Sequence, residues 1–89
     1  MIRRQLKLEL KNETVNSFIQ KANEFESAIK VIKHSKIVDG KDSSSMRALQ
    51  LECGNIITLV AEGGDEREAI EALSSVLKGE PSINSFKYL

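Results

Sequence analysis

The chain has 89 residues, of which 40% are hydrophobic, so its length suits one small domain and its composition is too apolar for a disordered segment. Thirteen Lys and Arg balance thirteen Asp and Glu, and this balance excludes a general attraction to nucleic acid or anionic lipid. The single cysteine, Cys53, excludes an internal disulfide and a multi-cysteine zinc site. No apolar run approaches the roughly 20 residues of a membrane span and no apolar leader follows Met1, so a cytoplasmic location is expected.

The charged residues are distributed unevenly along the chain. Residues 1–47 contain ten Lys and Arg against six Asp and Glu, whereas residues 48–89 contain three against seven. This asymmetry can orient a partner protein or a second copy of the chain, which leaves a homo-oligomer open. Mixed charged surfaces are common, however, and an ordinary solvated surface is the simpler interpretation.

The first half of the chain has the pattern of a strand, a helix and two further strands. Leucine alternates with polar residues over 5–11, which predicts a strand with one buried face. Apolar residues then recur at helical spacing, which predicts a helix over 15–25. Two short β-rich segments predict strands over 29–32 and 36–38, with His34 in the turn between them.

The second half predicts a helix, a buried strand and a final helix. The polar cluster at 42–45 is expected to begin a short helix that Gly54 ends, because Asp and Ser accept backbone N–H groups at helix starts. The run 56–60 is almost entirely apolar and mostly β-branched, which predicts a central, well-buried strand. Asp65 is expected to cap the last helix, and Glu68 has the spacing of a capping box.

The resulting element order is β-α-β-β-α-β-α. Helices on one face of a four-stranded antiparallel sheet make an open-faced α+β sandwich, and this is the expected fold class. The domain is predicted to span residues 1–80, because Gly79 and Pro81 end the last helix. Residues 81–89 then form a C-terminal tail, whose apolar side chains can dock on the core or on a partner.

Three stretches of the sequence carry a family resemblance. They are Leu6, Leu8, Leu10, Lys11 and Asn12 at the first strand; Ala22, Phe25, Ser27, Ile29 and Val31 between the first helix and the second strand; and Ala61-Glu62-Gly63-Gly64-Asp65-Glu66 with Ala69, Ile70 and Leu73 at the last helix. Together they resemble the HPr family, the phosphocarrier proteins of the bacterial sugar phosphotransferase system and their catabolite-repression relatives. The resemblance runs from about residue 2 to residue 78 and implies an HPr-like open-faced sandwich.

The resemblance implies an active loop that joins the first strand to the first helix and reads Gly-Leu-His-Thr-Arg-Pro or a close variant. In the family this His accepts phosphate from enzyme I and passes it to sugar transporters. A short gap after Asn12 places Glu13 at the Arg position and Thr14 at the Pro position; without the gap, Val15 falls at the His position. In either alignment the segment has no His, and a carboxylate at Glu13 would repel the phosphate.

No catalytic, cofactor or metal site is expected elsewhere, and no enzymatic activity is predicted. His34 is the single histidine, and no residue near it in the sequence fits catalysis or metal binding, so it is predicted to be an exposed turn residue. Cys53 has no second cysteine to pair with, and a buried or unreactive thiol is favoured.

The resemblance also implies a regulatory serine at the start of the second helix, which a dedicated kinase phosphorylates in many Gram-positive bacteria. The preferred alignment places Asp42 at this position. Asp42 either caps the helix, which is the simpler interpretation, or mimics a standing phosphate with one negative charge. An alignment shifted by three residues would place Ser45 at the site instead, so phosphorylation of Ser45 stays open.

Partners of the family dock on apolar residues directly after that serine. The matching positions here are Ser43 and Ser44, so the patch is polar in this chain. Met46, Arg47 and Gln50 offer a different contact surface, although one core residue and two solvated ones is the simpler interpretation.

These observations favour a non-catalytic, HPr-like regulatory or protein-interaction module that is unable to carry phosphate on histidine and whose partner is another protein. A phosphocarrier that uses a non-standard site is one alternative. A nucleic-acid-binding module is another, in which Arg3, Lys7 and Lys30 line the outward face of the sheet; it is disfavoured because that face is expected to lack the aromatic side chains on which bases stack. No membrane contact is predicted.

Overall fold

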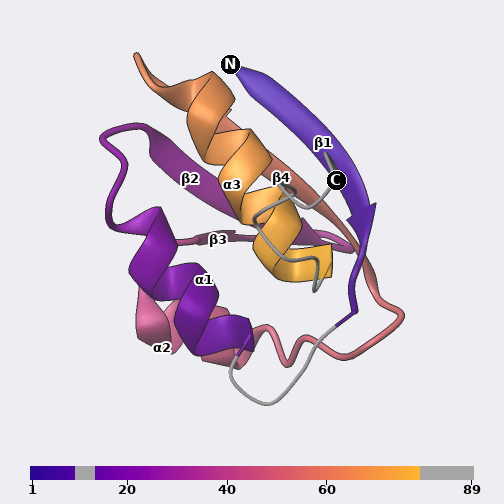
Figure 1. Ribbon diagram of the computed structural model, residues 1–89. Helices are drawn as coiled ribbons and strands as arrows, with labels where there is room; N and C mark the ends of the chain where they lie inside the picture. The colour runs from indigo at the N-terminus through magenta and orange to yellow at the C-terminus, as the bar shows by residue number, and fades with distance from the viewer. Residues whose placement is uncertain (10–13, 79–89) are drawn as a thin grey trace, which may run out of the picture.

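The seven predicted elements are present in the predicted order. The computed structural model describes residues 1–9 and 14–78 (Figure 1). The elements are β1 (Ile2–Lys7), α1 (Thr14–Ala22), β2 (Ala28–Lys33), β3 (Lys36–Asp39), α2 (Ser43–Ala48), β4 (Ile56–Glu62) and α3 (Glu66–Lys78).

The four strands form one antiparallel sheet in the order β1-β4-β2-β3. The apolar strand β4 lies between β1 and β2, which confirms the prediction of a central strand. Its alternate residues Ile57, Leu59 and Ala61 are at most 1% exposed, because they point toward the helices. The sheet therefore has one face that the helices cover and one open face.

The helices cover one face of this sheet, as Figure 1 shows, and the predicted open-faced α+β sandwich is confirmed. The core lies between the sheet and the helices α1 and α3, and α2 closes it at the end near β3. Its fully buried large side chains come from every layer: Leu8, Phe18, Ile29, Val31, Met46, Ile57, Leu59, Ile70, Leu73 and Leu77.

Helix α1 is shorter than the sequence predicts. It ends at Ala22, and both the backbone N–H and the side-chain amide of Asn23 donate hydrogen bonds to the carbonyl oxygen of Ile19. These two bonds satisfy a carbonyl group in the last turn, so the chain can leave the helix here. Phe25, which the prediction placed inside the helix, packs against the core from the connection to β2.

Helix α2 ends at Ala48, so the prediction that it continues to Gly54 was wrong. Gln50 has a φ of 53°, and this left-handed conformation stops the helix. The ammonium group of Lys33 donates hydrogen bonds to the carbonyl oxygens of Leu49 and Gln50, at 3.0 and 2.9 Å. A cation from strand β2 therefore stabilises the carboxyl end of α2.

Asp65 directly precedes α3, but its carboxylate bonds to a distant segment. It accepts the backbone N–H groups of Glu26 and Ser27, each at 2.9 Å, and also the hydroxyl of Ser27. These bonds hold the pKa of Asp65 below its ordinary value, and the bond with the Ser27 hydroxyl contributes most. In a capping box, the acidic side chain three residues after the cap accepts the N–H of the cap residue. Here Glu66 makes this bond, because its carboxylate accepts the Gly63 N–H at 3.0 Å. The predicted box between Asp65 and Glu68 is therefore replaced by one between Gly63 and Glu66.

Some predictions concern residues outside the described ranges 1–9 and 14–78. These are the strand position of Leu10, the alignment of Glu13 with the family arginine, the domain end at residue 80 and the tail 81–89.

The turn between β4 and α3 offers a test of the close packing around Ser27. A Cβ atom added at Gly63 would lie 2.6 Å from the Ser27 Oγ and 2.7 Å from its backbone Cα, and Gly63 has a φ of 154°. We therefore expect Gly63→Ala to destabilise the fold by about 2 kcal/mol. Gly64→Ala is the matched control, because an added Cβ there meets nothing within 4 Å. Urea unfolding of both variants measures the difference, and equal stabilities would contradict this packing.

Candidate functional site

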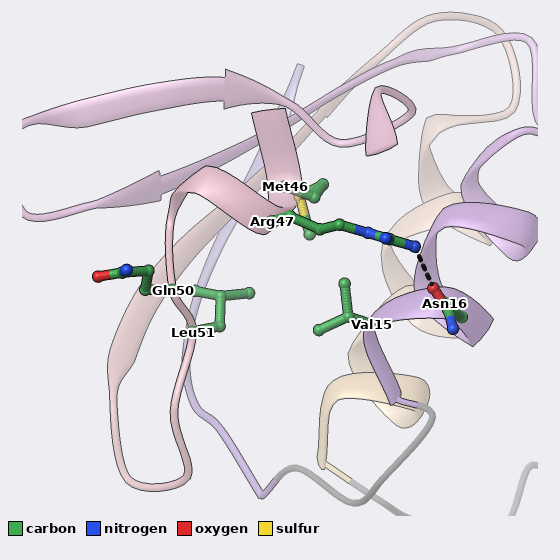
Figure 2. A pocket seen from close by; sticks show the side chains of 6 residues that line it. All are labelled: Val15, Asn16, Met46, Arg47, Gln50 and Leu51. Atoms are coloured by element: carbon green, nitrogen blue, oxygen red, sulfur yellow. Dashed lines mark hydrogen bonds between the residues drawn. The ribbon is translucent and has the colours of Figure 1, made fainter. Parts of the chain in front are cut away.

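The candidate site is a shallow pocket between the start of α1 and the end of α2, which we call the α1–α2 pocket. Its volume is about 340 Å³. Figure 2 shows the six side chains that line it: Val15, Asn16, Met46, Arg47, Gln50 and Leu51. The pocket therefore lies between α1, which follows the expected active loop, and α2, which Asp42 precedes.

One hydrogen bond crosses this pocket. The guanidinium of Arg47 donates to the side-chain oxygen of Asn16 at 3.0 Å, from α2 to α1 (Figure 2). Val15 and Leu51 lie below it as partly buried apolar walls. The result is a hollow with apolar walls and an equal share of polar side chains at its rim, and this mixture is the usual composition of a protein-binding surface.

Met46 was a candidate contact residue, and its burial corrects that expectation. Its side chain is 1% exposed and belongs to the core. It lines the base of the α1–α2 pocket but presents almost no surface to a partner. Arg47 and Gln50 are exposed, as the simpler interpretation expected.

Asp42 is the N-cap of α2, which confirms its predicted structural role. Its carboxylate accepts the Ser45 backbone N–H at 3.2 Å and the Ser45 hydroxyl at 2.5 Å. The hydroxyl bond is the main reason that the pKa of Asp42 lies below its ordinary value, and the N–H bond adds to it. Asp42 therefore carries a fixed negative charge at neutral pH at the position that the alignment gives to the regulatory serine.

Ser45 is engaged by the same carboxylate. Because its hydroxyl donates to Asp42, a phosphoryl group on the Ser45 oxygen would have to form beside a negative charge. Ser43 and Ser44 are exposed, so the segment that follows Asp42 presents polar side chains to solvent.

His34 lies on a different part of the molecule. It is exposed in the turn between β2 and β3, has a φ of 58°, and lines a hollow with Ile32 and Ile56 on the side of the sheet away from the helices. This confirms the expected exposed turn position. The α1–α2 pocket is on the helix side, so the structure separates the histidine from it.

The remaining sequence candidates form no centre within residues 1–9 and 14–78. Cys53 is free and exposed, so a buried thiol was the wrong alternative. The described residues contain no group of three or more His, Cys, Asp and Glu side chains arranged to hold a metal ion. Among the described helices, none has the length and apolar character to cross a membrane.

The sequence did not predict two contacts that shape the site. Asn16 and Arg47 are 31 positions apart, and Lys33 reaches the end of α2 from 16 and 17 positions away. Spacing along one helix or strand gives no signal for such pairs, because they depend on how two elements pack. The excess of cations in the first half of the chain is the only sequence feature related to them.

An open-faced sandwich with its candidate contacts on α1 and α2 is the architecture of the small phosphocarrier class. The HPr phosphocarrier of Bacillus anthracis superposes with a TM-score of 0.82 at 28% identity, over 86% of this chain and 96% of that one. The family model described as PTS HPr component phosphorylation site matches residues 5–79. The chain therefore belongs to the HPr family.

Two relatives belong to the HPr-like group named Crh. The HPr-like protein Crh of Halalkalibacterium halodurans is 36% identical over 84 residues, which is 90% of this chain and 100% of that protein. The solved structure of Crh, the catabolite repression protein of Bacillus subtilis, has a TM-score of 0.75 at 31% identity over 93% of this chain and 95% of that one. That Crh structure is a swapped, intertwined dimer.

The lowered pKa of Asp42 predicts how its charge contributes to stability. A carboxyl with a lower pKa in the folded chain stabilises the fold above its ordinary pKa of 3.8, and this contribution is lost as the pH falls through the lower folded value. Asp42→Asn keeps an N-capping side chain and removes the charge. We expect wild type to be more stable than Asp42→Asn above about pH 4 and the two to converge in more acid solution. Thermal unfolding across this pH range measures the difference, and a gap independent of pH would contradict the assignment.

Proposed function

We propose that this protein is a regulatory, protein-interaction member of the HPr family that does not carry phosphate on histidine and catalyses no reaction. The observation that carries the proposal is the position of the single histidine. His34 lies in the β2–β3 turn on the open side of the sheet, whereas the first helix, where the family's active loop ends, packs on the covered side.

The surroundings of His34 support this proposal. Phosphoryl transfer to an imidazole requires groups that stabilise the incoming negative charge, such as an arginine or a helix N-terminus. The side chains that share the hollow with His34 are neutral: Gln5, Ile32, Asn55, Ile56 and Thr58. A phosphoryl group on His34 would find no cationic side chain among them.

The interaction surface that we propose combines Asp42, Ser45 and Arg47 with the α1–α2 pocket. Asp42 supplies a permanent charge where the family uses a phosphorylatable serine, and Ser45 supports that charge instead of receiving a phosphate. Arg47 and Asn16 form a polar rim above an apolar hollow. The partner that fits is a protein with a cationic group opposite Asp42 and an apolar side chain for the pocket.

The relatives favour the same interpretation. The Bacillus subtilis relative is a catabolite repression protein, and a regulatory role is the analogous role here. Its swapped dimer also makes self-association a second mode of interaction for this chain.

Phosphotransfer gives a direct test. When the protein is incubated with enzyme I and labelled phosphoenolpyruvate, we expect no acid-labile label on it, because the single histidine, His34, lies in the β2–β3 turn and not at the start of a helix. A phosphocarrier HPr in the same reaction is the positive control. Label on wild type that disappears in His34→Ala would contradict the proposal.

Charge-reversal variants test the interaction surface. Wild type, Asp42→Lys and Arg47→Glu are used as baits on extracts of the native host, and proteins retained by wild type are quantified. We expect the recovery of at least one retained protein to fall by about tenfold or more with Asp42→Lys, because this variant places a cation opposite the partner's cation. We expect weaker recovery with Arg47→Glu, because this variant breaks the Arg47–Asn16 bond at the rim of the pocket.

Two exposed positions on α3 provide matched controls. Glu68→Lys makes the same charge change as Asp42→Lys, and Arg67→Glu makes the same change as Arg47→Glu. We expect both controls to retain the wild-type set. Recovery of the same proteins by all five baits would show that the start of α2 and the α1–α2 pocket are not the contact.

A further inference from the structure

The open face of the sheet carries a line of exposed isoleucines. Ile37 on β3 and Ile56 on β4 are 62% and 56% exposed, which is high for large apolar side chains. Ile32 on β2 lies between them, because it pairs with Ile37 on one side and with Thr58, two residues from Ile56, on the other. We call this line the isoleucine ridge, and no described element covers it.

Two hollows flank the isoleucine ridge. One, of about 520 Å³, is bordered by Gln5, Thr58 and Ile56 over β1 and β4. The other, of about 410 Å³, is bordered by Ala28, Lys30 and Asp39 over β2 and β3. A line of apolar side chains between two hollows can pack against a surface with the same arrangement.

The strand register places opposite charges at the two edges of this face. One row across the sheet runs Gln5, Thr58, Ile32 and Ile37, and the next outward-pointing row runs Arg3, Val60, Lys30 and Asp39. The ends of the second row therefore carry opposite charges on the two outer strands. Within the described residues Arg3 makes no ion pair, so its charge is available.

We propose that a second copy of the chain packs on the open face, with the two-fold axis running along the strands. Such an axis places β1 of each copy over β3 of the other, because these strands lie at opposite edges of the sheet. Ile37 then faces Gln5 of the second copy and enters the hollow that Gln5 borders. Arg3 likewise faces Asp39 of the second copy, and symmetry forms this pair twice.

The charges of the open face favour this occupant over nucleic acid. Arg3, Lys7 and Lys30 do lie on the open face, as the alternative hypothesis expected, but Asp39 and Glu62 share it. The described phenylalanines lie elsewhere, since Phe18 is in the core and Phe25 packs against it. Among the described residues this face has no phenylalanine, tyrosine or tryptophan and it carries carboxylates, so it fits a surface of mixed charge such as its own.

The interface is small. Four strands of four to seven residues, about 4.8 Å apart, cover a patch of about 20 by 20 Å, which is at the lower end of specific interfaces. A weak, concentration-dependent dimer is therefore expected. Sedimentation equilibrium of the full chain, from about 10 μM to about 1 mM, measures the dimer dissociation constant of wild type and of each variant.

The first arm of the experiment removes the ridge. Ile37→Asp places a charge in each of the two symmetric contacts between Ile37 and the hollow beside Gln5, and we expect it to raise the dimer dissociation constant by about 100-fold or more. Arg67→Asp on the exposed side of α3 is the control for a changed surface charge and should dimerise like wild type. Thermal unfolding of each variant confirms that its fold is intact.

The second arm exchanges the charges. Arg3→Asp alone and Asp39→Arg alone each place like charges opposite one another, so each should be monomeric at concentrations where wild type is dimeric. An equimolar mixture of the two variants should recover the dimer. In a mixed pair the aspartate introduced at position 3 faces the arginine introduced at position 39, and the unchanged Arg3 and Asp39 face each other. Recovery on mixing is not expected from a variant that has merely lost its fold.

The outcomes separate the alternatives. Dimerisation of wild type that is lost in the three single variants on this face and recovered in the mixture supports the proposal. A wild-type monomer at about 1 mM overturns it and leaves the face to another partner. A dimer unaffected by Ile37→Asp also overturns it, and indicates association through another surface or through strand exchange.

Discussion

The pairing of β4 with a strand on each side is the constraint on which the rest of the structure depends. Because its side chains alternate, Ile57, Leu59 and Ala61 face the helices while Ile56 and Thr58 face outward. A shift of one residue in the register would exchange the two sets and expose the core. The same alternation therefore fixes both the helix-covered face with the α1–α2 pocket and the open face with the isoleucine ridge.

The chain has the fold of the HPr family, but under our proposal it does not have the family's phosphate chemistry. The sheet, the helices and the core are those of HPr proteins, and proteins of this family are phosphocarriers. The core of the fold is defined by apolar packing, which tolerates many exchanges that conserve volume. Phosphate transfer needs a few polar groups at fixed positions, and no packing requirement retains them. Under our proposal this chain has kept the packing and uses Asp42 as a constant charge.

Much of the fold follows from the sequence, because period-two and helical patterns report directly which face of an element is buried. The element order, the central position of β4, the N-cap at Asp42 and the exposed turn at His34 were all predictable on this basis. The early end of α2 was not, because it depends on a left-handed Gln50 and on the distant Lys33. The role of Asp65 was missed for a similar reason: its bonding partners, Glu26 and Ser27, come from a segment far away in the sequence. Within the site, the burial of Met46 and the Arg47–Asn16 bond required the packing of two helices.

The Lys33 side chain has a mechanical consequence. It is the last residue of β2, next to the turn that carries His34, and its ammonium group holds the end of the helix that carries Arg47. The β2–β3 hairpin and α2 are therefore joined by these two bonds in addition to the burial of Met46 and Leu49, and a change in their relative tilt would lengthen the bonds. A displacement of the end of β2 would therefore also displace the carboxyl end of the helix that carries Arg47.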